Sequence, residues 1–196
     1  KNNSMKHIRT VVIVCCFSML FSACKSTKQA QALRDCNYSF ASISNLKVGD
    51  VYIQGKQSFR DLSMQETTGL SQLLMARKLP VSLTAHIAIQ NPNSKTAAID
   101  ALEWILEVRN KEVAKGEVTK RVEVKPGQTI QVPIDVATDL GNIFKAFSMK
   151  EITDVMFNIS NADGIPIEAK LKIKPSITVG RKQIKAPSYF VIDVMK

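Results

Sequence analysis

The chain has 196 residues, of which 45% are hydrophobic and 22% charged, and its formal net charge is +10. This length suits one domain with a substantial hydrophobic core. The two histidines and four cysteines form no cluster in the sequence, so no zinc site or other metal centre is expected. The glycines are isolated, so no phosphate-cradling loop and no cofactor site are expected either.

The N-terminus is predicted to be a secretion signal. Lys6 and Arg9 form a positively charged region, and residues 11–21 are almost wholly apolar. This run is much shorter than the about 20 apolar residues that a membrane-spanning helix needs. The next residues, Phe21-Ser22-Ala23-Cys24, resemble a bacterial lipobox, although leucine is more usual than phenylalanine at its first position. The resemblance implies that Cys24 receives a diacylglyceryl thioether and becomes the N-terminus of the mature lipoprotein.

Removal of the signal peptide, residues 1–23, deletes three basic residues and no acidic one, which lowers the formal charge from +10 to +7. Residues 24–35 are mostly polar and are predicted to form a flexible tether to the folded domain, residues 36–196. Lys25 follows Cys24, where some bacteria use Asp to retain a lipoprotein in the inner membrane. We therefore expect a lipid-anchored protein of the outer membrane that faces the periplasm. There, anionic lipid headgroups or envelope proteins are expected partners, and nucleic acid is not.

Residues 43–80 contain two further elements. Ile43–Ile53 is predicted to be a strand region with a bend or bulge at Gly49-Asp50. Ser63 and Glu66 match a capping box, and leucines follow at helical spacing, which predicts an amphipathic helix over residues 64–77.

From residue 81 the hydrophobic period changes to two, which is typical of antiparallel strands with one buried face. Turn-forming residues separate the runs, and Ser148 with Glu151 predicts a second helix over 149–157. The fold class is therefore mostly β, a β-sandwich with one or two short helices. The residues expected on its inner face include Leu83, Ile87, Leu102, Leu106, Val132 and Ile134.

Few residues suggest chemistry. A catalytic Cys–His pair would need Cys36 and His86, but His86 projects from the polar face of its strand. Asp135 and Asp139 lie close in sequence, yet no partner acid or base accompanies them. We therefore expect no catalytic residues and no enzyme activity. Cys36 is expected to be an inert thiol, because a lipidated Cys24 leaves it without a disulfide partner.

One outer face of the predicted sandwich is basic. We interpret it as a solvated or edge-protecting face, or alternatively as a contact for anionic headgroups. Trp104 is interpreted as a core anchor. The basic residues are Lys170, Lys172, Lys174, Arg181, Lys182 and Lys185.

Three motifs resemble the type-2 late-embryogenesis-abundant family, also called the WHy domain, over residues 80–175. They are the strand Leu83–Gln90 with its Asn91-Pro92-Asn93 turn, the segment Ile99–Trp104 with Val113–Gly116, and the segment Val124–Ile134 around Pro126-Gly127. The resemblance implies a fibronectin-III or immunoglobulin-like Greek-key β-sandwich without a catalytic centre. Asn91, Pro92, Asn93 and Gly116 are interpreted as serving the fold.

The sequence therefore predicts a lipid-anchored cell-envelope protein with a non-enzymatic structural, stress-related or binding role. Two alternatives stay open. One is a carrier of an apolar or lipid ligand between the sheets, which requires an unfilled interior. The other is an accessory subunit of an envelope protein complex, which requires an exposed apolar patch.

Overall fold

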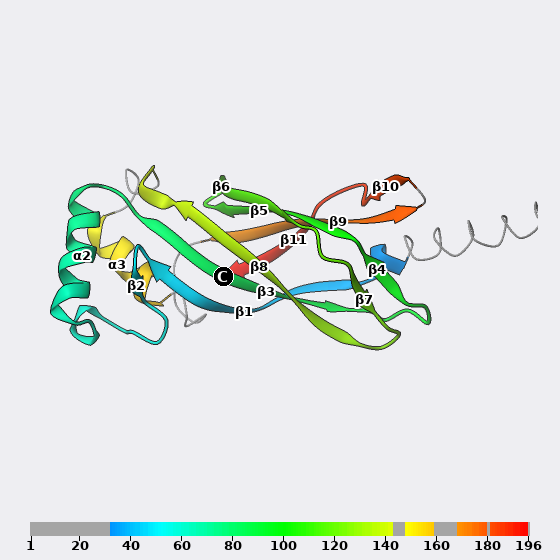
Figure 1. Cartoon of the computed structure of the whole chain (residues 1–196), viewed down its shortest axis with the longest axis horizontal. Coiled ribbons are helices and arrows are strands. Elements are labelled where there is room, and N and C mark those ends of the chain that lie inside the picture. Colours follow the sequence, from blue (N-terminus) through cyan, green and yellow to red (C-terminus); the bar gives the residue numbers. More distant parts are fainter. Residues whose placement is uncertain (1–31, 143–147, 159–167, 180, 196) are drawn as a thin grey trace, which may run out of the picture.

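The computed structural model describes residues 32–142, 148–158, 168–179 and 181–195. The predicted signal peptide, the predicted lipidation site Cys24 and residues 25–31 of the predicted tether lie outside the described residues. Figure 1 shows an elongated molecule in which strands dominate. The strands are β1 (Asn37–Val48), β2 (Val51–Tyr52), β3 (Pro80–Gln90), β4 (Ala97–Ile99), β5 (Ala101–Val108), β6 (Lys111–Val118), β7 (Val122–Val124), β8 (Thr129–Asp139), β9 (Ala169–Val179), β10 (Lys182–Lys185) and β11 (Phe190–Met195). The helices are α2 (Met64–Met75) and α3 (Met149–Asn158), with 3-10 turns η1 (Phe59–Asp61) and η2 (Leu140–Asn142), and residues 32–34 form a further helical turn.

Two antiparallel sheets enclose the main core. One sheet has the strand order β2-β1-β3-β8, and the other has the order β10-β9-β5-β6 with β11 also pairing with β9. β4 and β7 form a small sheet of their own at the end of the molecule opposite α2 and α3 (Figure 1). The prediction of a mostly β fold with antiparallel strands is confirmed.

The alternating pattern decides which side of each strand is buried. On β3, Ala85, Ile87 and Ile89 are buried, whereas His86 lies on the opposite face. The six residues predicted for the inner face all belong to, or pack against, one hydrophobic cluster between the sheets. They are Leu83, Ile87, Leu102, Leu106, Val132 and Ile134.

Two prolines lie where the sheets require no donor. Pro133 is on β8, which stands last in its sheet order, and an edge strand tolerates a residue that cannot donate to a ladder. Pro175 is inside β9, which pairs with β5 on one side and with β11 and then β10 on the other. The Pro175 carbonyl accepts from the Ala186 N–H at 2.9 Å, so its ring nitrogen faces the gap between β11 and β10.

A second hydrophobic cluster lies beneath the helices. Leu46 and Val48 of β1 pack there with Leu70 of α2 and with Met156 and Phe157 of α3. The cluster closes the helical end of the sandwich, while the main cluster fills the space between the sheets.

Both predicted helices are present and both begin at the predicted capping boxes. The Ser63 N–H donates to Glu66 Oε2 at 2.7 Å, and the Glu66 N–H donates to Ser63 Oγ at 3.2 Å. Ser148 and Glu151 exchange the same pair of bonds at 2.7 and 3.3 Å. The end predicted for α2, residue 77, is wrong by two residues because Arg77 adopts a left-handed φ of 53°.

Candidate anchoring site where the N-terminal segment enters the fold

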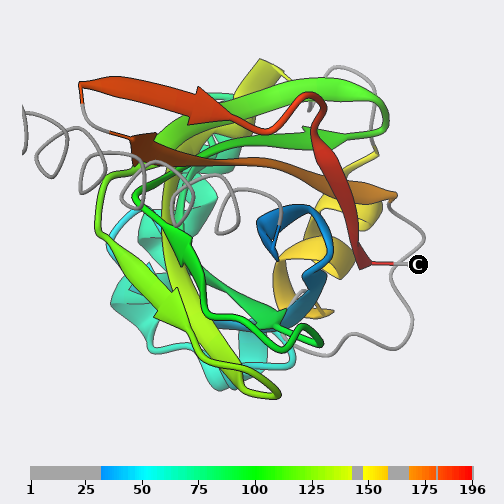
Figure 2. The ribbon, with the colours of Figure 1, turned by 90° about the vertical axis from the view of Figure 1, so that its right-hand side faces the viewer.

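Residues 32–36 lead into β1 and lie between the sheets at one end of the molecule (Figure 2). Ala32 and Leu33 are each 4% exposed and Cys36 is 5% exposed. The Tyr38 hydroxyl donates to the Leu33 carbonyl at 2.9 Å. The prediction of a flexible tether over residues 24–35 is therefore wrong for Ala32 and Leu33, which are packed into the core, whereas Arg34 and Asp35 are exposed.

Asn91, at the end of β3, is the centre of a buried hydrogen-bond cluster. It is 0% exposed, and its side-chain amide donates to the carbonyls of Lys95 and Val124 at 2.8 Å each. Its side-chain oxygen accepts from the Asn93 N–H at 3.0 Å and from Asn93 Nδ2 at 2.9 Å. The Asn91 side chain thus donates two hydrogen bonds and accepts two, all within the turn and its neighbours. A side chain without both amide donors and the amide oxygen would leave some of these partner groups unpaired.

Asn93 connects this turn to the N-terminal segment. Its Nδ2 also donates to the Ala32 carbonyl at 3.0 Å, across 61 positions of sequence. Pro92 sets the backbone between the two asparagines, because its ring fixes φ. The Asn91-Pro92-Asn93 turn therefore acts as a clamp on residues 32–36, which agrees with its interpretation as a structural motif.

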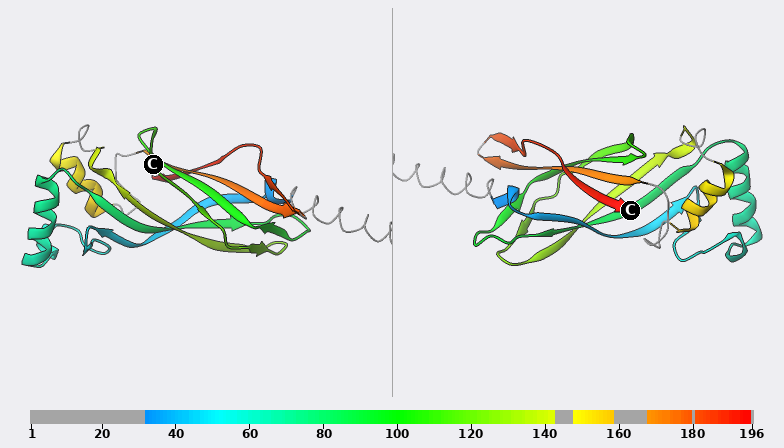
Figure 3. Two further views of the ribbon diagram at one scale, coloured as in Figure 1. Left: turned by 45° about the horizontal axis from the view of Figure 1, so that its top comes forward. Right: turned by 180° about the vertical axis from the view of Figure 1, so that it is seen from behind.

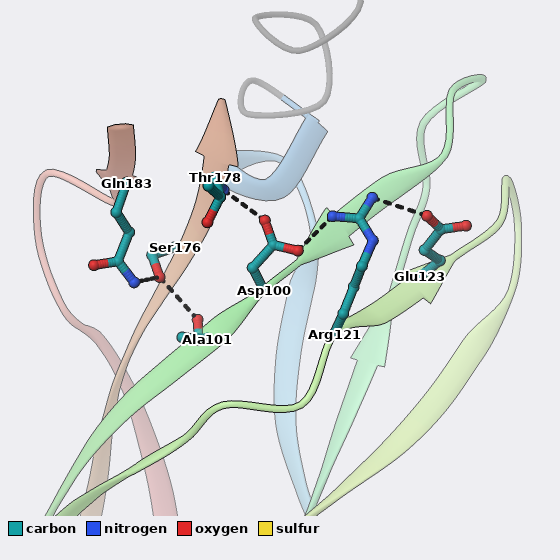
Figure 4. Close-up of polar contacts among 7 residues, drawn as sticks. All are labelled: Asp100, Ala101, Arg121, Glu123, Ser176, Thr178 and Gln183. Carbon is teal, nitrogen blue, oxygen red and sulfur yellow. Dashed lines mark hydrogen bonds and ion pairs between the residues drawn. The ribbon is translucent and has the colours of Figure 1, made fainter. Parts of the chain in front are cut away.

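A second polar cluster surrounds Asp100, between β4 and β5 (Figure 4). The Asp100 carboxylate accepts from the Thr178 N–H at 2.5 Å and forms an ion pair with Arg121, which also contacts Glu123 at 2.9 Å. Burial opposes ionisation of Asp100, but the hydrogen bonds from Thr178 and Arg121 outweigh it and hold its pKa below the ordinary value. The cluster connects the end of β9 to the segments that flank the small β4-β7 sheet.

Ser176 adds a buried contact at the same end (Figure 4). Its hydroxyl donates to the Ala101 carbonyl at 3.3 Å and accepts from Gln183 Nε2 at 2.9 Å. β9 is thereby connected to β5 on one side and to β10 on the other. The Asn91 and Asp100 clusters together place two groups of hydrogen bonds at the end of the molecule where residues 32–36 enter the fold.

The two residues of the suspected catalytic pair have other partners. Cys36 Sγ donates to the Ala32 carbonyl at 3.3 Å, and burial, with a smaller effect of Asp35, raises the pKa of its thiol to about 11. His86 Nε2 lies 2.8 Å from Ser44 Oγ on the outer face of the sheet. This arrangement suits an inert thiol at Cys36 and a histidine that connects the outer faces of β1 and β3 through Ser44.

Asp135 and Asp139 also do not form an acid pair. Asp135 Oδ1 accepts from Thr84 Oγ1 at 2.7 Å, whereas Asp139 Oδ1 accepts from the Leu79 N–H at 2.9 Å and the Gly141 N–H at 2.8 Å. They are four positions apart along β8, which separates their Cα atoms by about 13 Å. Backbone hydrogen bonds hold the pKa of Asp139 below its ordinary value, so its role is to brace the junction of β3 and η2.

Three of the six residues of the predicted basic face form ion pairs with acids. Lys172 contacts Glu107 at 2.6 Å, Lys170 contacts Glu168, and Lys185 contacts Glu103. The edge-protecting interpretation is wrong for the lysines of β9, because this strand is internal to its sheet. It suits β10, which ends the sheet order.

Within the described residues, no three His, Cys, Asp or Glu side chains are grouped to hold a metal ion. No helix in the same part of the chain is long and apolar enough to cross a bilayer. Sequence reasoning did not single out Asp100 or Arg121 as an interacting pair. Asp100 is 78 positions from Thr178 and 21 positions from Arg121 in the sequence, and only the fold brings these residues together.

Residues 86–188 match the family model LEA_2, described as late embryogenesis abundant protein. None of the curated proteins matches the chain. Among solved structures, a protein from Archaeoglobus fulgidus is 14% identical to this chain, with a TM-score of 0.37. The match covers 79% of this chain and 93% of that protein. An Arabidopsis thaliana protein is 17% identical with a TM-score of 0.38, covering 80% of this chain and 82% of that one. A putative late embryogenesis abundant protein is 15% identical, with a TM-score of 0.36. The match covers 95% of this chain and 88% of that protein.

Proposed function

This chain belongs to the late embryogenesis abundant protein family LEA_2, and from that membership we propose a stress-related, non-enzymatic protein that a lipid on Cys24 holds in the cell envelope. Its role in this proposal is structural support at the membrane. The proposed location is the outer membrane. The proposed connectivity is a Greek-key, fibronectin-III-like one, and the antiparallel pairing of the strands supports this second part.

The observation that carries the proposal is the clamp on the N-terminal segment. Asn93 donates to the Ala32 carbonyl, and Leu33 is buried in the main core. Ala32 lies eight positions after Cys24, and eight extended residues span at most about 28 Å. A lipid on Cys24 would thus be joined by a short tether to the end of the domain that carries the Asn91 and Asp100 clusters.

The contacts of the titratable groups also favour a structural role. Asp61, Glu66, Asp139 and Glu151 all accept backbone N–H groups at caps or turns, and these bonds hold each carboxyl pKa below its ordinary value. A catalytic acid or base needs a pKa near the working pH, which such bonds oppose.

Replacement of the lipidated cysteine tests the anchor. In a bacterial host with lipoprotein processing, the wild-type protein should enter the detergent phase on phase separation, and its mass should report removal of residues 1–23 and addition of lipid. Cys24→Ser should remain in the aqueous phase or unprocessed. Cys36→Ala is the matched control, because it removes a buried cysteine outside the lipobox. Equal partitioning and equal masses for wild type and Cys24→Ser would contradict the anchor.

A further inference from the structure

The end of the molecule at which residues 32–36 enter the fold carries exposed basic side chains on four of its segments. One lies in the entering segment, one in the turn after β3, one in the turn after β7, and two where the chain turns into β10. We call these five residues the basic end: Arg34, Lys95, Lys125, Arg181 and Lys182. Asp35 is the one acid within the segments that supply them, residues 32–36, 91–96, 125–128 and 181–182.

Hydrogen bonds hold these segments next to one another. The Gly127 N–H donates to the Asn91 carbonyl at 2.8 Å, which joins the turn after β7 to the turn after β3. Asn93 connects the latter turn to Ala32, and the Asp100 cluster connects the end of β9 to the start of β5. Both views in Figure 3 place these segments together, at the end opposite the two helices. The five charges therefore share one end of an elongated molecule.

The charge of the basic end is not neutralised inside the fold. Within the described residues, no ion pair joins any of its five members to an acid. Arg121 also lies at this end, but it pairs with Asp100 and Glu123. The opposite end is balanced, because residues 50–79, 109–110, 139–142 and 148–158 contain six basic and six acidic residues. An excess of positive charge therefore distinguishes one end of the domain from the other.

A membrane surface with anionic headgroups is the partner that this charge suits. Each basic residue held near such a surface strengthens binding by a factor of about five. The five side chains come from separate loops, so a laterally extended layer of phosphate groups can contact them together. The chain also continues from this end toward Cys24, which lies eight positions before Ala32. Under the proposed anchor, the bilayer would lie within about 28 Å of the basic end.

We propose that the basic end is the surface through which the domain contacts the anionic headgroups of a membrane. This surface differs from the predicted basic face on β9, where Lys170 and Lys172 already pair with acids. The contact deepens the proposed function and rests on it, because the anchor would bring this end to the bilayer. Its test uses no attached lipid, so the anchor and the contact can fail separately.

Vesicle binding by the full chain tests the proposal, with Cys24→Ser so that no lipid is attached. The vesicles contain phosphatidylcholine alone, or phosphatidylcholine and phosphatidylglycerol in a two-to-one ratio. Residues 11–21 are almost wholly apolar and bind both kinds, so binding to the neutral vesicles is the baseline. At about 0.1 M salt the chain should bind the anionic vesicles about tenfold more tightly or better. Most of this difference should vanish at about 1 M salt, where charges are screened within about 3 Å.

Removal of charge from three loops locates the contact. Lys95→Gln, Lys125→Gln and Lys182→Gln together should weaken binding to the anionic vesicles about tenfold or more, without a change on the neutral vesicles. Arginine at the same three positions should retain the binding, because the headgroups respond to the charge. If circular dichroism shows that the glutamine variant is unfolded, Arg181→Gln with Lys182→Gln replaces it and should weaken binding about fivefold or more.

The matched control removes three exposed charges from the opposite end: Arg60→Gln, Lys78→Gln and Lys111→Gln. The length of β3 separates the two ends by about 33 Å, whereas charges are screened over about 10 Å at about 0.1 M salt. The control should therefore bind the anionic vesicles within about twofold of the unchanged chain.

Four results would overturn the proposal: equal binding to both kinds of vesicle, no loss in the glutamine variant, an equal loss in the control, or an equal loss in the arginine variant. A failed anchor has a different signature, because the wild-type protein would then stay in the aqueous phase or unprocessed on phase separation. That result would not alter the vesicle measurements, which are made with serine at position 24.

Discussion

At the scale of single residues, Gly116 shows how the fold depends on a missing side chain. It lies opposite Trp104 in the β5-β6 pair, and a Cβ there would come within 2.6 Å of the indole ring. Trp104 is a buried member of the main cluster, as its interpretation as a core anchor predicted. Gly116→Ala should therefore lower the free energy of unfolding by about 1–3 kcal/mol. Urea unfolding measures it, with Gly69→Ala as the control, since nothing lies within 4 Å of a Cβ at that position.

Cys36 is a second residue whose environment predicts its behaviour. Burial raises the pKa of its thiol to about 11, so very little thiolate exists at pH 8. Alkylation of the folded chain at pH 8 should be at least about a hundredfold slower than alkylation of the unfolded chain. The test uses serine at positions 15, 16 and 24, and mass spectrometry counts the modified thiol. Rapid stoichiometric labelling of the folded protein would show that Cys36 is reactive.

At the scale of elements, the turn after β3 should control the order of the N-terminal segment. Asn93→Ala removes the donor to the Ala32 carbonyl and one donor to Asn91, which should cost about 1–2 kcal/mol. Hydrogen exchange should accelerate first in residues 33–38. Asn37→Ala is the control, because Asn37 makes an exposed bond to Gln90. Unchanged exchange in residues 33–38 would mean that the turn is not the clamp.

The inner faces of the strands distinguish a packed sandwich from a ligand carrier. Leu106 is half-buried on β5 and packs against the main cluster. In a packed core, Leu106→Ala should destabilise the protein by about 2 kcal/mol or more. In a carrier, the truncation would instead change the amount of bound ligand. Unfolding curves and lipid extracts of the same preparations decide, and one stoichiometric lipid together with a negligible loss of stability would favour the carrier.

Local signals explain which elements were predictable from sequence. Ser63 with Glu66 fixes a helix start through bonds within four residues, and the alternation on β3 assigns its buried face without knowledge of its partners. The extension of β9 through Pro175 was not predictable, because it depends on a gap between β11 and β10. The Asp100 cluster was missed for the same reason, since its bonds join residues far apart in the chain.

At the scale of the whole molecule, the paired carboxylates predict how stability responds to acid. The pKa values of Asp61, Glu66, Asp100, Asp139 and Glu151 are all lower in the folded protein than their ordinary values. A carboxyl whose folded pKa is lowered stabilises the fold above its unfolded pKa, and this contribution is lost as the pH falls through the folded pKa. These groups should therefore make the free energy of unfolding fall as the pH drops below about 4.

Asp100 should contribute to this acid response more than a surface carboxyl does, because it is partly buried and accepts from both Thr178 and Arg121. Asp100→Asn should lower the stability at pH 7 and flatten the decline between about pH 5 and 2, since the group no longer titrates. Urea midpoints measured across this range test the prediction. Asp50→Asn, on the exposed turn between β1 and β2, is the matched control and should keep the wild-type slope. An Asp100→Asn curve parallel to the wild-type curve would show that this end of the fold is braced by packing and not by the charge of Asp100.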